Sequence, residues 1–311
     1  MRYIDADTAH RLLDYRGLIE ALREMYRRGV DIAERYVLHE TLPDGRQNDW
    51  LLLPAWQFGR HQGIKLVSVY PGNAAKGLAS VQGLYVLFDG SNGLPLLAID
   101  GAALTLRKTV CNSALAVDYL ARKDASKLLV VGAGALAPHV VAAHGSVRPI
   151  RQVKIWNRTR EKAAMLARQL ARPGLAVEAA GDLEEALRWA DLITTVTMSK
   201  APLVKGAWLK PGQHLDLIGG FRPDMREADD EAVRRARLFV DARFSVLEEC
   251  GDIAQPLAAG LVKEPDITDL FQLARGERPG RQRDDEITFF KSGGGGHEDL
   301  ATAQYLASRL G

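Results

Sequence analysis

The sequence has few cysteines, no excess of charge of either sign and no long uninterrupted apolar run. Its two cysteines, Cys111 and Cys250, form no metal-ligand pattern, so we expect no metal site and a reducing compartment, the cytoplasm. Lysine and arginine number 41 against 39 acidic residues, and the formal charge of +2 gives no reason to expect nucleic acid or a membrane surface as partner. Met1–Asp7 lacks the apolar core of a signal peptide, and the longest apolar stretch contains a glycine turn, so we expect no membrane span.

The remaining composition, with 47% hydrophobic and 26% charged residues, is that of a globular protein. A chain of 311 residues is long for one hydrophobic core and predicts two domains. Near the start, Leu18, Ile19, Leu22 and Met25 mark one face of a helix that Gly29 is expected to end.

The two halves of the chain carry different patterns. Strand-like runs separated by turn signals come first, at residues 35–42, 50–53, 64–70, 84–88 and 94–99, and predict a sheet of mainly hairpin type. A long amphipathic stretch at 102–121 follows. Strand patterns at 127–131, 153–156, 192–196, 214–218, 238–241 and 287–291 then alternate with helical ones at 138–147, 182–189 and 299–310, which predicts an α/β domain.

A glycine pattern follows the first of these strands. The run Lys127–Val131 leads into Gly132-Ala133-Gly134-Ala135-Leu136-Ala137, which has the form of a dinucleotide-binding turn. Gly132 allows the tight turn, Gly134 lets the backbone approach a pyrophosphate, and Ala137 lets the helix pack closely on the sheet. The N–H groups of the helix start would hold the phosphates.

The end of the next strand indicates which cofactor is preferred. A turn that selects NAD places an acidic residue there for the ribose 2′-hydroxyl, whereas this chain has Asn157-Arg158-Thr159-Arg160. Two guanidinium groups suit a 2′-phosphate, so we expect NADPH, with NADH as the second possibility. The alternative is that Arg158 and Arg160 form only the solvated start of a helix.

Four consecutive glycines, Gly293–Gly296, are costly to order. They form either a mobile loop or a place where the backbone lies against a ligand.

Several motifs together resemble the ornithine cyclodeaminase/μ-crystallin family over essentially the whole chain. They are Leu53-Pro54-Ala55, Gly63-Ile64-Lys65 with Tyr70-Pro71-Gly72-Asn73, the segment 104–109, Gly132 to Ala137, and Lys291-Ser292-x-Gly294 with Glu298-Asp299. The resemblance implies a Rossmann domain at 123–286, inserted in an α+β substrate-binding and dimerisation domain made of 1–122 and 287–311. It also implies a homodimer.

The resemblance assigns substrate residues among the cations. Arg35 matches an arginine that clamps the substrate carboxylate, and Lys65 matches a lysine that faces the reacting centre, where it steadies the carboxylate and passes a proton. The family usually reads Arg-Thr where this chain has Lys108-Thr109, with Arg107 just before, so either Arg107 or Lys108 is expected to contact substrate. Lysine keeps the charge but loses the bidentate fork.

Two acidic residues of cyclodeaminases are replaced. The matching positions are Leu51 and Phe221, both apolar. Cyclodeamination needs a base to manage the amine, whereas reduction of an imine needs less proton transfer. The segment from Gly219 to Glu227 resembles the family members that reduce Δ1-pyrroline-2-carboxylate and Δ1-piperideine-2-carboxylate.

We therefore expect an NADPH-dependent reductase of small cyclic imino acids, giving proline, pipecolate or both. The alternatives are an ornithine or lysine cyclodeaminase, an amino-acid dehydrogenase, or a non-catalytic binder of NADPH and a small carboxylate. Asp299 is a second candidate proton donor or else a helix N-cap, and His297 is expected to be a solvated loop residue. The expected cofactor-binding residues, several of them implied by the resemblance, are Thr109, Gly132, Ala133, Gly134, Ala135, Leu136, Ala137, Asn157, Arg158, Thr159, Thr197 and Phe221.

Overall fold

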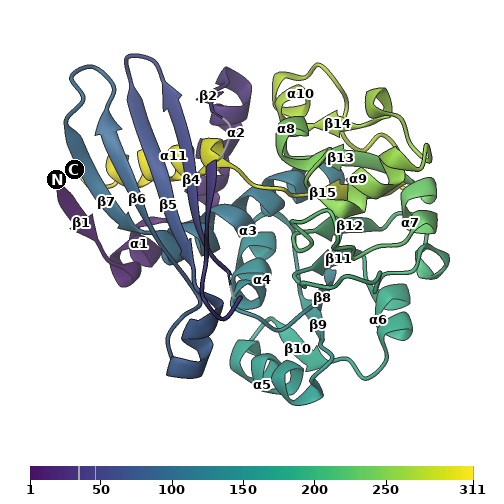
Figure 1. The fold of residues 1–311 in the computed structure, drawn as a ribbon. Helices are drawn as coiled ribbons and strands as arrows, with labels where there is room; N and C mark the ends of the chain where they lie inside the picture. Colours follow the sequence, from purple (N-terminus) through teal and green to yellow (C-terminus); the bar gives the residue numbers. More distant parts are fainter. Residues whose placement is uncertain (34–35, 46, 311) are drawn as a thin grey trace. The chain divides into compact units, whose positions relative to one another are not determined.

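The structure is a computed structural model that describes residues 1–33, 36–45 and 47–310. The chain forms two compact units (Figure 1). Unit 1 comprises Met1–Lys108 and Gly295–Gly311, and unit 2 comprises Thr109–Gly294. Both ends of the chain therefore contribute to one unit, and the middle forms the other.

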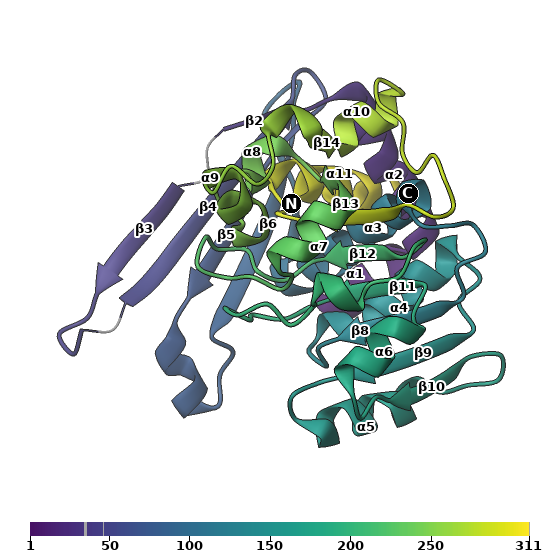
Figure 2. The ribbon, with the colours of Figure 1, turned by 90° about the vertical axis from the view of Figure 1, so that its right-hand side faces the viewer.

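Unit 1 is built on a sheet that has seven strands in the described part of the chain, in the order β1-β7-β6-β5-β4-β2, with β3 paired to β4. All pairings are antiparallel except that of β1 with β7. The β3–β4 hairpin is conspicuous in Figure 2. The strands are β1 (Arg2–Ile4), β2 (Asp31–Ile32), β3 (Tyr36–Thr41), β4 (Gln47–Gln57), β5 (His61–Val69), β6 (Val81–Asp89) and β7 (Pro95–Asp100). The prediction of a hairpin-type sheet is confirmed.

Helices cover one face of this sheet. The helices of unit 1 are α1 (Ala6–Leu12), α2 (Tyr15–Arg28), α11 (Gly296–Ser308) and the beginning of α3 (Gly101–Leu120), with a 3-10 turn η1 (Pro71–Lys76). Helix α11 packs on β4, β5 and β6 and against α2 (Figure 1). The predicted apolar face of α2 is confirmed, because Leu18, Ile19, Leu22 and Met25 are buried and Gly29 ends the helix with φ of 87°.

Unit 2 is a parallel sheet of eight strands, counted over its described residues, with order β10-β9-β8-β11-β12-β15-β13-β14. The strands are β8 (Lys127–Val131), β9 (Gln152–Trp156), β10 (Ala176–Ala179), β11 (Leu192–Thr195), β12 (His214–Leu217), β13 (Ala236–Val240), β14 (Thr268–Asp269) and β15 (Ile287–Lys291). The helices are α4 (Leu136–Val147), α5 (Arg160–Leu170), α6 (Leu183–Trp189), α7 (Asp230–Arg235), α8 (Arg243–Val246), α9 (Gly251–Ala258) and α10 (Leu270–Arg275), with 3-10 turns η2 (Gly206–Trp208) and η3 (Glu264–Asp266). This doubly wound arrangement is the predicted Rossmann-type α/β fold.

The boundaries of the units differ from the predicted domains, which were 1–122 with 287–311 and 123–286. Strand β15 pairs in parallel with β12 and β13, so residues 287–294 belong to unit 2. The buried run Ile287–Lys291 identifies a strand but not the sheet that it joins, because sheet partners are set by contacts distant in sequence. The second boundary falls inside α3, after Lys108.

Across the ranges 1–33, 36–45 and 47–310, no helix combines the length and the apolar composition that crossing a bilayer requires.

The two glycines of the turn after β8 give a matched pair of predictions. Gly132 has φ of 115°, and an added Cβ would lie 2.9 Å from the carbonyl oxygen of Val196, whereas a Cβ at Gly134 would meet nothing within 4 Å. We expect Gly132→Ala to lower the free energy of unfolding by about 1–3 kcal/mol, because alanine strains this backbone. Gly134→Ala should leave it nearly unchanged. Urea unfolding of both variants tests this, and equal stabilities would contradict it.

Candidate cofactor and substrate sites

Unit 2 carries a pocket of about 390 Å³ at the turn after β8. Seven of the predicted cofactor residues line it, and they share a position at the carboxyl ends of β8, β9 and β11: Gly132, Ala133, Gly134, Asn157, Arg158, Thr159 and Thr197. The other lining residues are Trp156, Lys162, Val196, Met198, Ser199 and Leu203. Ligands of doubly wound sheets bind at this edge.

The start of helix α4 is suited to phosphate. Ala135 is the N-cap residue and has no side-chain hydrogen bond to the helix start, so the first N–H groups of Leu136 and the following turn are not capped by a side chain. Ala137 is fully buried, as its role in close helix packing requires. Because Gly134 presents only backbone toward open space, a pyrophosphate can approach these N–H groups.

The end of β9 presents cations to the same pocket. The Asn157 side chain accepts a hydrogen bond from the N–H of Ala133 at 3.2 Å and donates to the carbonyl of Thr159 at 2.9 Å, so it holds the glycine turn. Arg158 lines the pocket and is exposed, whereas Arg160 begins α5 and is not a lining residue. Arg160 therefore lies at the solvated start of a helix, as the alternative interpretation expected, whereas Arg158 lies at the pocket.

Lys162 is a pocket residue that the sequence analysis missed. Lys162 follows Arg158 by four residues, and this spacing could have indicated that the two cations lie at the same pocket. Five predicted residues are not among those that line this pocket: Ala135, Leu136 and Ala137 at the start of α4, Thr109 on α3 and Phe221 after β12. Phe221 is 48% exposed.

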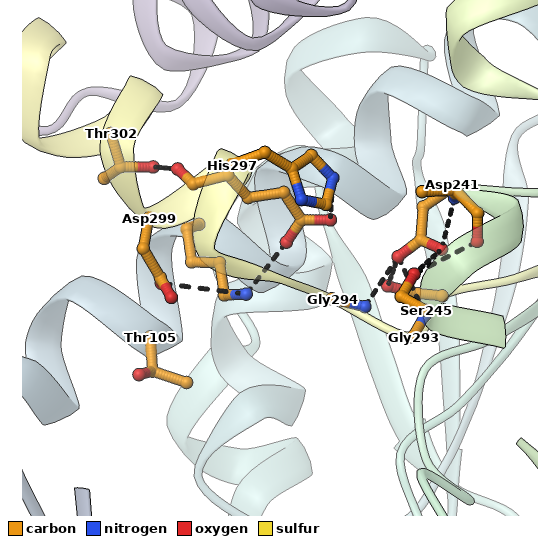
Figure 3. Close-up of polar contacts among 12 residues, drawn as sticks. Thr105, Asp241, Ser245, Gly293, Gly294, His297, Asp299 and Thr302 are labelled. Carbon is orange, nitrogen blue, oxygen red and sulfur yellow. Dashed lines mark hydrogen bonds and ion pairs between the residues drawn. The ribbon is translucent and has the colours of Figure 1, made fainter. Parts of the chain in front are cut away.

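Unit 1 contains a buried cluster of two lysines and two carboxylates. Lys65 on β5 lies 3.3 Å from Asp299 Oδ1 and donates to Thr105 Oγ1 at 2.6 Å. Lys108 on α3 lies 2.9 Å from Glu298 Oε2 and 3.7 Å from Asp299 Oδ1. Glu298 and Asp299 are both 0% exposed, on the first turn of α11, where the helix dipole favours negative charge. Figure 3 shows Asp299 directed from α11 into this cluster.

Aromatic side chains enclose the cluster. The Tyr26 hydroxyl donates to Glu298 Oε1 at 3.2 Å and lies 3.4 Å from His297 Nε2. Tyr85 is also fully buried, and its ring occupies the space that a side chain at Gly63 would need. The charged groups are therefore almost completely buried: the side chains of Lys65 and Lys108 are 9% and 7% exposed.

Burial changes the proton affinity of this cluster. Burial lowers the pKa of Lys65 below that of a free lysine, although the nearby Asp299 acts in the opposite direction. Burial also raises the pKa of Tyr85 well above its usual range, with a further contribution from Asp299. The Asp299 Oδ2 atom and the Tyr85 hydroxyl have no hydrogen-bond partner among the described residues. Buried polar atoms of this kind are expected to contact a ligand.

The structure separates the two candidates at positions 107 and 108. Lys108 belongs to the cluster, whereas the Arg107 guanidinium donates to His10 Nδ1 at 3.0 Å and to the His10 carbonyl at 2.9 Å. It also lies over the Tyr15 ring, 4.3 Å from the centroid. Successive residues on a helix point about 100° apart, so Lys108 reaches the cluster while Arg107 is directed to His10 and Tyr15.

Two further expectations for α11 are corrected. His297 is 0% exposed and lies within the helix, so it is not a solvated loop residue. The N-cap position belongs to Gly295, and the Asp299 carboxylate pairs with lysines instead of capping the helix. Arg35 lies outside the described residues. Leu51 is half-buried on β4, on the same face as Lys65 by strand alternation.

The glycine run is ordered by the protein itself. Asp241, at the end of β13, accepts hydrogen bonds from the N–H groups of Gly293 at 2.7 Å and Gly294 at 2.6 Å, and from Ser245 Oγ at 3.2 Å (Figure 3). Gly294 has φ of 71°, and a Cβ at Gly293 would lie 2.4 Å from the Ser245 carbonyl. The first two glycines are therefore required by a close internal contact, an explanation that neither alternative included.

Comparison with known proteins agrees with this geometry. The family model described as "Ornithine cyclodeaminase/mu-crystallin family" matches residues 8–310. A Delta(1)-pyrroline-2-carboxylate reductase of Paracoccus denitrificans is 39% identical over 306 residues, which are 95% of this chain and 92% of the relative.

Two solved structures resemble the whole chain. The Delta(1)-pyrroline-2-carboxylate reductase of Thermococcus litoralis, in complex with NADH and L-proline, superposes with a TM-score of 0.89 at 29% identity, covering 99% of this chain and 97% of that one. An archaeal alanine dehydrogenase dimer with bound NAD gives 0.88 at 26% identity, covering 99% and 95%.

Proposed function

We propose that this chain, which belongs to the ornithine cyclodeaminase/mu-crystallin family, reduces the C=N bond of small cyclic imino acids with NADPH. By family it is an NAD(P)H-dependent oxidoreductase that acts on such bonds. The substrates are Δ1-pyrroline-2-carboxylate, Δ1-piperideine-2-carboxylate or both, and the products are proline and pipecolate. The observation that carries the proposal is the buried cluster of Lys65, Lys108, Glu298 and Asp299 with its unpartnered Asp299 oxygen.

Lys65 and Lys108 would bind the substrate carboxylate. An ammonium group can donate three hydrogen bonds, and Lys65 has two partners among the described residues, Thr105 and Asp299, so it can donate to a further acceptor. A lysine in place of the family's arginine keeps the positive charge but lacks the planar guanidinium. The lysines would therefore bind the carboxylate through charge and single hydrogen bonds, without a bidentate contact. We retain Arg35 as a third cation of the proposed site.

Asp299 would hold the proton that the imine nitrogen needs. The Asp299 carboxylate is fully buried, and its Oδ2 atom has no hydrogen-bond partner among the described residues, so this oxygen is placed to face the imine nitrogen of a bound substrate. Its proton can pass to the imine nitrogen, with Lys65 as the alternative donor because its pKa is lowered by burial.

The pocket of unit 2 fits a dinucleotide, and when bound that cofactor supplies the hydride. The uncapped start of α4 and the bare backbone of Gly134 would hold the pyrophosphate. Arg158 and Lys162, on the same pocket as Thr159, would bind a 2′-phosphate, and no acidic residue lines this pocket in the described residues. These features support NADPH over NADH.

The alternatives have less support. Cyclodeamination needs acidic groups to handle an amine, and the matching positions carry Leu51 and Phe221. An amino-acid dehydrogenase remains the second candidate because of the likeness to the alanine dehydrogenase. A binder without turnover would not need a buried carboxylate with a free oxygen, which is expensive to maintain.

We also propose a homodimer formed through the outer face of the unit 1 sheet. Lys65 and Tyr85 face the buried side, so strand alternation places their neighbours on the opposite face. That face is apolar and partly exposed, with Tyr36 at 57%, Leu38 at 55% and Trp50 at 53%. Its apolar residues are Tyr36, Leu38, Trp50, Leu52, Trp56, Ile64, Leu66, Leu84, Val86 and Phe88, and the same alternation places the polar residues Glu40, Asn48, Gln62, Ser68 and Gln82 among and around them. A large exposed apolar face is typical of an interface. The occupant would be a second copy of this chain, and the dimeric state of the similar alanine dehydrogenase supports this choice.

We place the enzyme in the cytoplasm. Both cysteines are buried, and neither forms a disulfide within the part of the chain that the structure describes, which suits a reducing compartment.

For the dimer, we expect Trp50→Arg to convert the protein to a monomer, because a cation would be buried in an apolar interface. Light scattering should give twice the mass of the chain for the unmodified protein and the mass of one chain for the variant. Phe244→Arg, at an exposed aromatic residue of unit 2, is the matched control and should stay dimeric. A monomeric unmodified protein would refute the proposed interface.

For the substrate, the unmodified protein should oxidise NADPH with both cyclic imines and release negligible ammonia from ornithine or lysine. Lys65→Ala and Lys108→Ala should each lower kcat/KM for the imine roughly ten- to hundredfold, the value of one charge-assisted contact. Arg107→Ala, one position away, should retain most activity. Ammonia release from ornithine at a rate similar to imine reduction would refute the proposed reaction, and full activity of Lys65→Ala would remove that residue from the site.

For the cofactor, Arg158→Ala should raise the KM for NADPH about tenfold or more while changing that for NADH little, because only NADPH has the 2′-phosphate. Arg160→Ala is the control for charge loss at the same turn and should affect both cofactors equally. Steady-state kinetics with the two cofactors provide the comparison. If the unmodified protein uses both equally, the preference is wrong.

A further inference from the structure

Three fully buried charged residues of unit 2 have no role in the chemistry described so far. Glu227, Asp252 and Lys291 are each 0% exposed. Glu227 lies ahead of α7, Asp252 lies on α9, and Lys291 ends β15. Burying three charges is costly unless they are paired and hydrogen-bonded.

Each of these three side chains forms a hydrogen bond with the backbone of another segment. Glu227 Oε1 accepts from the N–H of Thr197 at 2.8 Å and from its hydroxyl at 2.7 Å. Asp252 Oδ1 accepts from the N–H groups of Glu227 at 2.8 Å and Ala228 at 3.1 Å. The Lys291 ammonium donates to the carbonyl of Gly219 and lies 3.5 Å from Asp252 Oδ2.

The segments held in this way are the loops that follow β11 and β12. Residues 196–199 line the proposed cofactor pocket. The N–H of Gly220 donates to the Thr197 carbonyl at 3.2 Å, and a Cβ at Gly219 would lie 1.9 Å from that same oxygen. The two loops are therefore in direct contact. Glu227 binds the loop after β11 and Lys291 binds the loop after β12, while Asp252 binds the backbone of Glu227 and pairs with Lys291.

The position in the sheet relates these loops to one half of the cofactor. In a doubly wound sheet a dinucleotide spans the carboxyl ends of the strands, with the adenosine half on one side of the first strand and the nicotinamide half on the other. Strand order places β9, with Arg158 at its end, on one side of β8, and β11 and β12 on the other side. The loops after β11 and β12 thus face the nicotinamide half.

The three residues do not balance in charge. Two carboxylates face one ammonium, which leaves one excess negative charge, and Asp252 Oδ2 has no hydrogen-bond partner in the described part of the chain. The other titratable groups that act on Lys291 are Asp241, at the end of β13, and Cys250, ahead of α9. Neither Asp241 nor Cys250 can carry a positive charge, so neither neutralises the excess negative charge of the three residues.

We propose that Glu227, Asp252 and Lys291 are positioning residues whose net negative charge stabilises the positively charged, oxidised nicotinamide ring relative to the neutral, reduced ring. Negative charge fixed at these residues would favour the positively charged form of a bound nicotinamide ring over the neutral form, because fixed charge needs no reorganisation when the ring changes its charge. The inference rests on the proposed function, because it requires a nicotinamide cofactor in the pocket of unit 2.

The test compares binding of the two redox forms without substrate. Glu227→Gln keeps an oxygen that can accept from Thr197 and removes the charge. We expect this variant to bind NADP⁺ about tenfold more weakly and NADPH nearly unchanged, the effect of one charge over about 10 Å at an effective dielectric constant of about 20. Asp252→Asn removes the same charge from another element and should shift the ratio of the two dissociation constants in the same direction. Glu231→Gln, on the exposed part of α7, should not change it.

Calorimetric titration of each protein with NADP⁺ and with NADPH gives the ratio. An unchanged ratio in both folded variants, or equal weakening of the two forms, would overturn the proposal, since a purely structural role affects both alike. Failure of the unmodified protein to bind any nicotinamide cofactor would refute the proposed function instead, so the two failures are distinguishable.

A second readout needs no cofactor. Burial raises the pKa of Glu227 to about 6, although Lys291 acts against this. The stability that the neutral carboxyl contributes is therefore complete below a pH of about 4.5 and is lost as the pH rises through about 6. The Tm of Glu227→Gln relative to the unmodified protein should accordingly be higher at pH 8 than at pH 5. No change in that difference would show that the buried charge assumed here is absent.

Discussion

The contacts between two buried ammonium groups and two adjacent carboxylates determine the arrangement of unit 1. Lys65 on β5 and Lys108 on α3 meet Glu298 and Asp299 on the first turn of α11, so the last helix of the chain is bound to its first sheet. Charges of this kind are stable in a protein interior only when their partners are fixed. The sheet, the beginning of α3 and α11 must therefore all be in place before the site exists, and the site is formed in advance of any substrate.

The sequence allowed the local parts of this structure to be predicted. The turn at Gly132, the apolar face of α2 and the hairpins of unit 1 depend on residues a few positions apart, and all three are confirmed. Lys65 could be identified as a site residue through the resemblance, and its burial beside Asp299 fits that role.

Features that depend on distant pairing could not be predicted. The strand β15 was recognised, but its place between β12 and β13 depends on partners some 50 to 75 residues away. The same applies to Asp241, which orders the glycine run, and to Asp216, whose carboxylate accepts from Ser113 at 2.5 Å and Thr194 at 3.0 Å inside the unit 2 core. Arg107 and Lys108 are adjacent on α3 and so point about 100° apart, but which of the two faces the carboxylates depends on where α11 packs.

In both units charge is fixed in place before the reaction. Unit 1 presents cations for a carboxylate and an aspartate oxygen for a proton, and unit 2 presents a phosphate-binding helix start and a buried negative cluster.

The most direct measurement of the central claim uses NADPH that carries deuterium on one face of C4, with Δ1-pyrroline-2-carboxylate as substrate. The account predicts that one of the two labelled forms yields proline with a single deuterium at its α-carbon. Proline without deuterium from both labelled forms, or no proline from either form, would contradict it.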